Sequence, residues 1–248
     1  MKRSYAMVVV MLALASGAEA QQLSIQIENL QPAGGMSFTP FWIGVHDGTF
    51  DAFNAGTAAS TLAGITSIAE VGDTSALSGR FTAEQPGGTQ TTFAEPNGPP
   101  VFSPGESATT DLSVANPSTY RHLNYASMVV PSNDLFLGND GAIEVFDNTG
   151  QFVGPIVINI LGTSVWDNGT EVNDITDGPA FIDGVDGTLG TDETEVIRTF
   201  FTVAGADDYL NSIIGQTTAP GGTITETFGR QDVIGRLTIT PEPSSMAL

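Results

Sequence analysis

Most of the chain consists of short β-forming runs separated by turn signals. Leu23, Ile25 and Ile27 alternate with polar residues, a period of two that is typical of a strand with one buried face. Further β-rich runs cover residues 41–45, 108–114, 123–130, 152–161, 198–203, 223–228 and 233–240. Breaks rich in Gly, Pro, Asn and Asp separate these runs. The pattern predicts an all-β fold, a single antiparallel β-sandwich.

One segment departs from the strand pattern. Leu62, Ile65 and Ile68 recur at helical spacing, which predicts a short helix over residues 58–71 on a connection between strands. Neither a composition break nor a long internal repeat divides the rest, so residues 21–240 are interpreted as one domain. We expect its core to include Leu23, Ile25, Ile27, Phe41, Ile43, Met128, Val130, Ile156, Ile158 and Ile160.

The first twenty residues have the organisation of a secretory signal. Lys2 and Arg3 precede a ten-residue apolar run over 6–15, and small residues follow up to Ala20. Ten apolar residues are too few for a helix that crosses about 30 Å of hydrocarbon. The sequence therefore predicts cleavage after Ala20, a secreted or cell-surface location, and no transmembrane helix in the mature chain.

Composition excludes several classes of function. The chain has 28 Asp and Glu against 7 Lys and Arg, and this net charge of −21 predicts no binding to nucleic acid. The lack of cysteine excludes disulfides, thiol catalysis and zinc–thiolate sites. The single lysine, Lys2, lies in the predicted signal, which excludes Schiff-base and Walker-type phosphate chemistry.

Catalytic motifs are scarce. The sequence has no Gly-x-Ser-x-Gly elbow and no His-Glu-x-x-His helix. His46 beside Asp47 could orient an imidazole for serine activation, but it is more typical of a turn histidine, and His122 is interpreted as an exposed residue at a strand start. We therefore predict a protein that is not an enzyme. A hydrolase with a carboxylate pair remains a minor alternative.

Acidic residues are concentrated in one stretch. Eleven carboxylates lie between Asp167 and Asp208, with Arg198 as the only base among them. Such density is typical of a solvated face, but carboxylates on loops repel one another unless a cation lies among them, and hard oxygen ligands favour Ca²⁺. No run fits the EF-hand spacing, since Val185 occupies the third position after a start at Asp183.

Two segments resemble the spondin domain family, which includes F-spondin and mindin. Residues 126–134 (ASMVVPSND) match the family's Ser-Met-x-x-Pro-Ser-x-Asp run, and residues 166–174 (WDNGTEVND) match its Asp-Ala-Gly-Thr-Asp/Glu segment. The resemblance covers residues 23–239. Flanking matches are Phe38-Thr39-Pro40, His46-Asp47, Glu70-x-Gly72-Asp73-Thr74, Pro104-Gly105-Glu106 and the strand over 234–239.

The resemblance implies a C2-like antiparallel sandwich with one bound Ca²⁺, held by Asp134, Asp167 and Glu171. Gly169 permits a tight turn, and acids four residues apart on a loop can converge on one ion. The chain departs from the animal proteins at Glu171, where they carry Asp. It also lacks their cysteines and thrombospondin-type repeats, so their matrix and neuronal roles are not carried over.

These observations predict an exported, non-enzymatic, calcium-binding module for cell-surface or extracellular-matrix adhesion. Its partner would be an unknown extracellular protein or polysaccharide. An exopolysaccharide-associated structural protein, whose metal is incidental, is an alternative. Residues 240–248 (TPEPSSMAL) also resemble the start of a PEP-CTERM sorting tail without its apolar span and basic cluster, so 241–248 is interpreted as a polar remnant of such a signal.

Overall fold

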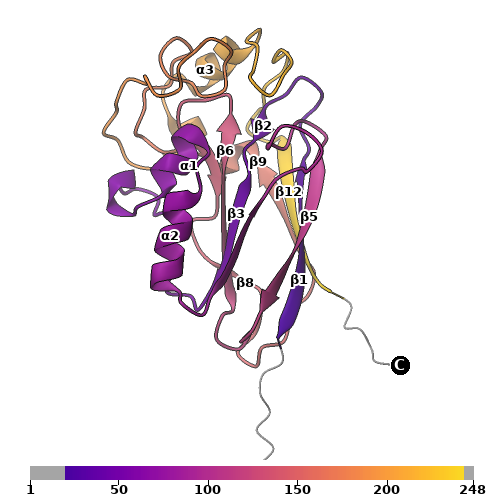
Figure 1. Ribbon diagram of the computed structural model, residues 1–248. Coiled ribbons are helices and arrows are strands. Elements are labelled where there is room, and N and C mark those ends of the chain that lie inside the picture. The colour runs from indigo at the N-terminus through magenta and orange to yellow at the C-terminus, as the bar shows by residue number, and fades with distance from the viewer. Residues whose placement is uncertain (1–19, 243–248) are drawn as a thin grey trace, which may run out of the picture.

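The computed structural model describes residues 20–242, which form two antiparallel sheets packed face to face (Figure 1). The smaller sheet has the order β5 (Ser107–Val114), β1 (Gln21–Asn29), β12 (Val233–Pro241) and β9 (Ile156–Leu161). The larger sheet has the order β11 (Arg198–Thr199), β10 (Val165–Asp167), β7 (Leu135–Gly138), β6 (His122–Val130), β3 (Phe41–His46) and β4 (Thr89–Phe93). Two short strands, β2 (Ser37–Phe38) and β8 (Ile143–Glu144), also pair with β6. The all-β sandwich expected from the sequence is confirmed.

The predicted signal, apart from Ala20, and the predicted tail from residue 243 onward lie outside the described residues. No helix within 20–242 combines the length and the apolar character that a bilayer span requires.

The alternating pattern of β1 places one of its faces in the core between the sheets. Leu23, Ile25 and Ile27 have no exposed surface, while the residues between them are partly exposed. Ile25 lies opposite Thr110 of β5 and Ile239 of β12, so the strand is paired on both sides. Burying each of these side chains contributes roughly 1.5–3 kcal/mol.

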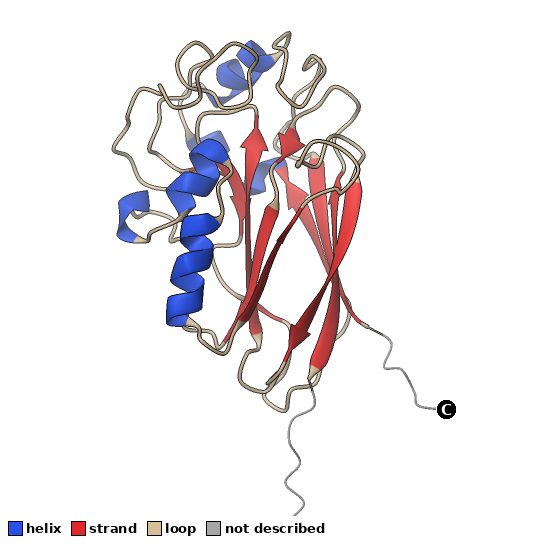
Figure 2. Ribbon diagram, in the orientation of Figure 1, coloured by secondary structure: helices blue, strands red, loops and turns tan. Residues whose placement is uncertain are grey.

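A layer of helices covers the outer face of the larger sheet (Figure 2). It contains α1 (Ile65–Val71) and α2 (Ser75–Glu84). Strand β3 is therefore buried on both faces, because Phe41 and Ile43 point to the smaller sheet while Trp42 points to the helices. The second cluster contains Trp42, Ala126 and Phe136 from the sheet and Ile65, Ile68, Leu77 and Phe81 from the helices.

The helices differ from the sequence expectation. The helix predicted over 58–71 is divided into a 3₁₀ turn, Ala59–Thr61, and α1, because Gly64 adopts a left-handed conformation with φ of 108° between them. Helix α2 and a third helix, α3 (Ala206–Ile213), were not predicted.

Three of the expected strands are also corrected. The run 198–203 is extended only at Arg198–Thr199 before a 3₁₀ turn, and 223–228 forms no strand within the described part of the chain. The run 152–161 becomes a strand only from Ile156.

Eight of the ten predicted core residues are buried, but Ile156 and Ile158 are only half-buried. Strand β9 lies at the edge of the smaller sheet, where the two sheets leave its inward side chains partly uncovered.

Candidate cation site

Two loops lie in contact at one end of the larger sheet. Residues 131–134 connect β6 to β7, and residues 168–171 follow β10. Because β10 pairs with β7 in a register that places Asp167 opposite Leu135, Asp134 lies close to Asp167. Asp134 Oδ2 accepts hydrogen bonds from the backbone N–H of Thr170 (2.9 Å) and of Glu171 (3.1 Å). The structure thus places Asp134, Asp167 and Glu171 in a single loop cluster.

The turn after β10 depends on one glycine and on α1. Gly169 has φ of 69°, and a β-carbon there would overlap the backbone of Glu195 and Val196. Asn168 Nδ2 donates to Thr170 Oγ1 (2.8 Å) and to Thr66 Oγ1 on α1 (3.3 Å). The helix layer therefore helps to hold the loop that carries Glu171.

The three carboxylates are buried without enough partners. Asp134 and Asp167 are 0% exposed and Glu171 is 7% exposed. Asp134 Oδ1, Asp167 Oδ1 and Glu171 Oε2 have no hydrogen-bond partner within residues 20–242. Leaving buried ionised oxygens unpaired costs free energy, so this cluster differs from an ordinary acidic surface.

Burial makes these groups harder to ionise. It raises the pKa of Asp134 to about 8, with a further contribution from the nearby charge of Asp167. Burial also raises the pKa of Glu171 to about 7, and the charges of Glu70 and Asp192 add to this effect. The pKa of Asp167 is raised by burial despite the opposing effects of Asn173 and Arg198. Burial and mutual repulsion therefore both oppose full ionisation of the cluster, and the charge of Arg198 offsets this only in part at Asp167.

The structure adds neighbours that the sequence did not assign to the site. Asn173 Nδ2 donates to Asp167 Oδ2 at 2.6 Å, and Arg198 Nε lies 3.3 Å from Asp167 Oδ1. Glu70 lies on α1, and burial raises its pKa as well. Sequence signals could have found all three: Asn173 and Glu70 lie in the motifs at 166–174 and 70–74, and Arg198 is the only base in the acidic stretch.

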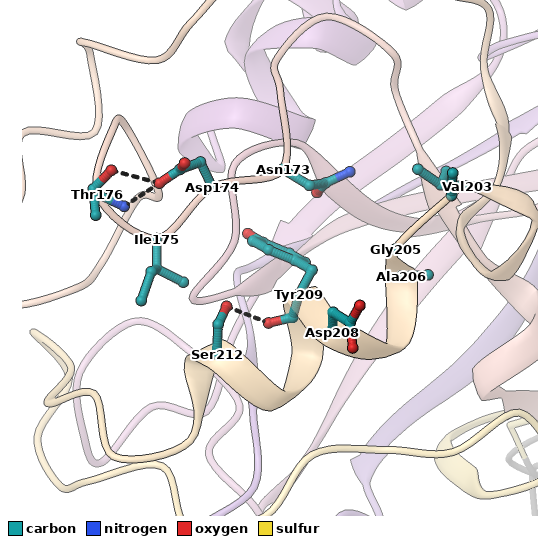
Figure 3. A pocket seen from close by; sticks show the side chains of 11 residues that line it. Asn173, Asp174, Ile175, Thr176, Val203, Gly205, Ala206, Asp208, Tyr209 and Ser212 are labelled. Carbon is teal, nitrogen blue, oxygen red and sulfur yellow. Dashed lines mark hydrogen bonds between the residues drawn. The ribbon is translucent and has the colours of Figure 1, made fainter.

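Hydrogen bonds of the Asn133 side chain connect the site to α3. Its Oδ1 accepts from Tyr209 Oη (2.7 Å) and from the N–H of Asp174 (3.1 Å). Between residues 173–176 and the start of α3 lies a hollow of about 390 Å³, with Asn173 and Tyr209 on its wall (Figure 3). Its lining, among the described residues, includes none of the three carboxylates.

The donor chemistry of the cluster fits a hard cation. Carboxylates with free oxygen lone pairs are ligands that Ca²⁺ prefers, and their buried position makes a counter-charge valuable. Within residues 20–242, no three His, Cys, Asp or Glu side chains are grouped as they stand to hold a metal ion. A cation would therefore have to draw the carboxylates towards a common point.

The two histidines match their expectations only in part: His46 closes a strand and contacts the turn that follows it, as expected, whereas His122 is not exposed. His46 is fully buried in β3, and its Nε2 lies 2.7 Å from Asn124 Oδ1 while its Nδ1 accepts from the N–H of Gly48. Both ring nitrogens are thus engaged by groups other than serine. His122, at the start of β6, is half-buried rather than exposed.

Comparison with known proteins found neither a matching family model nor a matching curated protein. The resemblance to the spondin domain family stays a prediction that rests on the motifs at 126–134 and 166–174.

Proposed function

We propose that this chain is an exported, non-enzymatic β-sandwich module that binds Ca²⁺ through Asp134, Asp167 and Glu171. The observation that carries the proposal is the set of three buried carboxylates, each with one oxygen that accepts no hydrogen bond within the described residues. A divalent cation supplies both the ligand-accepting orbitals and the positive charge that such oxygens require.

Charge balance supports a divalent rather than a monovalent ion. Asp134, Asp167, Glu171 and Glu70 supply four potential negative charges, and Arg198 offers one positive charge at 3.3 Å from Asp167. When Ca²⁺ is bound it neutralises two of these charges. The chain's own residues set the geometry: the N–H groups of Thr170 and Glu171 orient Asp134, and Asn173 orients Asp167.

The proposed biological role is adhesion at the cell surface or in the extracellular matrix, with an extracellular protein or polysaccharide as partner. The predicted secretory signal supports it, because extracellular fluid commonly holds millimolar calcium and even a weak site is then filled. The deep burial of Asp134 and Asp167 favours a structural over a hydrolytic role, since neither side chain is exposed to a substrate.

A thermal-unfolding experiment tests the metal assignment. Calcium should raise the melting temperature. At a hundredfold excess of calcium over Kd, the free energy of unfolding increases by about 2.7 kcal/mol. Asp134→Asn keeps an oxygen for the N–H groups of Thr170 and Glu171 but removes one charge. We expect it to lower calcium affinity steeply, while the metal-free protein keeps or gains stability.

Asp183→Asn is the matched control, because Asp183 lies in the acidic stretch but is exposed to solvent. The metal assignment fails if chelator leaves the melting temperature of the calcium-loaded protein unchanged, or if the two variants respond alike. The adhesive role predicts calcium-dependent retention on immobilised cell-surface polysaccharide or matrix protein. Retention that is equal in calcium and in chelator would favour the alternative of an incidental metal.

A further inference from the structure

The fold places one arginine directly opposite a candidate ligand. Strands β10 and β11 pair in a register that sets Arg198 across from Asp167. No other Lys or Arg occurs between Arg121 and Arg230 in the sequence. The only base of the acidic stretch is therefore held by backbone pairing against the most deeply buried of its acids.

The guanidinium of Arg198 contacts three carboxylates. Its Nε lies 3.3 Å from Asp167 Oδ1, its Nη1 lies 3.3 Å from Glu195 Oε2, and its Nη2 lies 3.4 Å from Glu193 Oε2. The side chains of Glu193 and Glu195 are 29% and 54% exposed, whereas that of Asp167 is 0% exposed. The group thus bridges the buried cluster and the solvent.

The contact between Arg198 and the buried Asp167 is weaker than the contacts to Glu193 and Glu195, because it is not a hydrogen bond. Arg198 Nε and Asp167 Oδ1 are close enough for an ion pair, yet neither forms a hydrogen bond to any residue of 20–242. Both contacts to Glu193 and Glu195 use the terminal nitrogens rather than Nε, and both are hydrogen bonds. A small movement of the side chain could therefore release Asp167 while Glu193 and Glu195 keep the guanidinium.

We propose that Arg198 is a built-in, exchangeable counter-ion of the carboxylate site. In the cation-free protein it neutralises Asp167, and it yields that carboxylate when Ca²⁺ binds, remaining on Glu193 and Glu195. This inference rests on the proposed calcium function and adds a residue that sets its affinity. Arg198 lowers the affinity for the cation, because like charges repel, and it stabilises the metal-free fold.

The test uses the chain with Arg198→Gln, and Arg121→Gln as the matched control. Arg121 forms an exposed ion pair with Glu144 at 3.1 Å and contacts no residue of the site. Calcium titration calorimetry should give roughly a tenfold lower Kd for Arg198→Gln, since a neighbouring positive charge is removed. In chelator the same variant should melt at a lower temperature than the wild type. Arg121→Gln should change neither quantity appreciably.

Arg198→Gln thus strengthens calcium binding while it lowers the stability of the metal-free protein. A merely structural role would not produce this combination. An unchanged or higher Kd in Arg198→Gln overturns the inference while leaving the proposed function intact, provided that the wild type binds calcium. Absence of calcium binding by the wild type overturns both. Should the variant fail to fold, the NMR resonance of the wild-type Arg198 Nε–Hε group decides. Calcium should shift it, and a resonance that stays in place at saturation contradicts the exchange.

Discussion

Two buried polar clusters lie at opposite ends of β6, the strand labelled in Figure 1. They differ in how well their hydrogen bonds are satisfied. Near the start of β6, His46 Nδ1 accepts from the N–H of Gly48 at 3.1 Å, so its Nε2 donates to Asn124 Oδ1 at 2.7 Å. Asn124 Nδ2 in turn donates to the carbonyl of Asn139 at 3.2 Å. Burial lowers the pKa of His46, which favours its neutral form.

Beyond the end of β6, burial is equally complete but partners are missing. Asp134 and Asp167 are as buried as His46, yet each keeps one oxygen without a hydrogen bond inside the described part of the chain. The comparison shows that burial alone does not mark a binding site. A satisfied network fixes the packing of two strands, whereas an unsatisfied one costs stability and gains from a ligand.

The largest expected difference between the clusters is in pH dependence. Asp134 and Glu171 have folded pKa values of about 8 and about 7, above the ordinary values of 3.8 and 4.5. Their contribution to stability is full below about pH 4 and is lost as pH rises through 7 and 8. His46 acts in the opposite sense: its contribution is full above about pH 6.5 and is lost as pH falls through its lowered pKa.

Urea unfolding in chelator, between about pH 5 and 8, should therefore show a free energy of unfolding that falls with pH by the order of a few kcal/mol. Asp134→Asn should flatten this slope because its side chain does not titrate, and saturating calcium should flatten it as well if the proposed site is correct. An identical slope in the wild type and in Asp134→Asn would mean that ionisation of Asp134 does not destabilise the folded protein.

A smaller effect is expected from breaking the satisfied cluster. Asn124→Ala removes the acceptor for His46 Nε2 and a donor to Asn139, and leaving such buried groups unpaired costs about 1–3 kcal/mol. Chemical denaturation should detect this loss, while the shift in melting temperature caused by calcium stays as in the wild type. Asn159→Ala, which removes an exposed contact to Arg236, is the control and should cost much less. Loss of the calcium response in Asn124→Ala would mean that the two clusters are coupled through β6.

The sequence predicted those parts of the fold in which local pattern and burial agree. The alternation of Leu23, Ile25 and Ile27 gave β1 correctly because one face of that strand is buried. The continuous apolar run over 41–45 indicates that β3 is covered on both faces, since an unbroken run is typical of such a strand. Its partner, α2, was missed because only Leu77 and Phe81 of that helix are buried.

The site was predictable only where its residues lie in the two motifs. Asp134, Asp167 and Glu171 were chosen from sequence, and the structure places them in one loop cluster. Glu70 and Arg198 approach from α1 and from β11, whose positions depend on long-range packing and strand pairing. Strand β10 has only three residues, too few for any periodicity, so the register that sets Arg198 against Asp167 is not visible in the sequence.

The smallest effect is expected from a substitution that crowds the side chain of Glu171. It tests whether this residue, which is one methylene longer than the Asp of the animal spondin domains, belongs to the same site as Asp134. A β-carbon on Gly190 would overlap the Glu171 carboxylate, while the backbone of Gly190 lies outside the left-handed region and accepts alanine. Gly190→Ala should displace that carboxylate and raise the Kd for calcium by a few-fold, which corresponds to roughly 1 kcal/mol. Gly141→Ala is the control, because nothing among the described residues lies within 4 Å of the added methyl group. Calorimetry on both variants gives the answer: equal Kd values would remove Glu171 from the ligand set and leave Asp134 and Asp167 as the carboxylates that hold the ion.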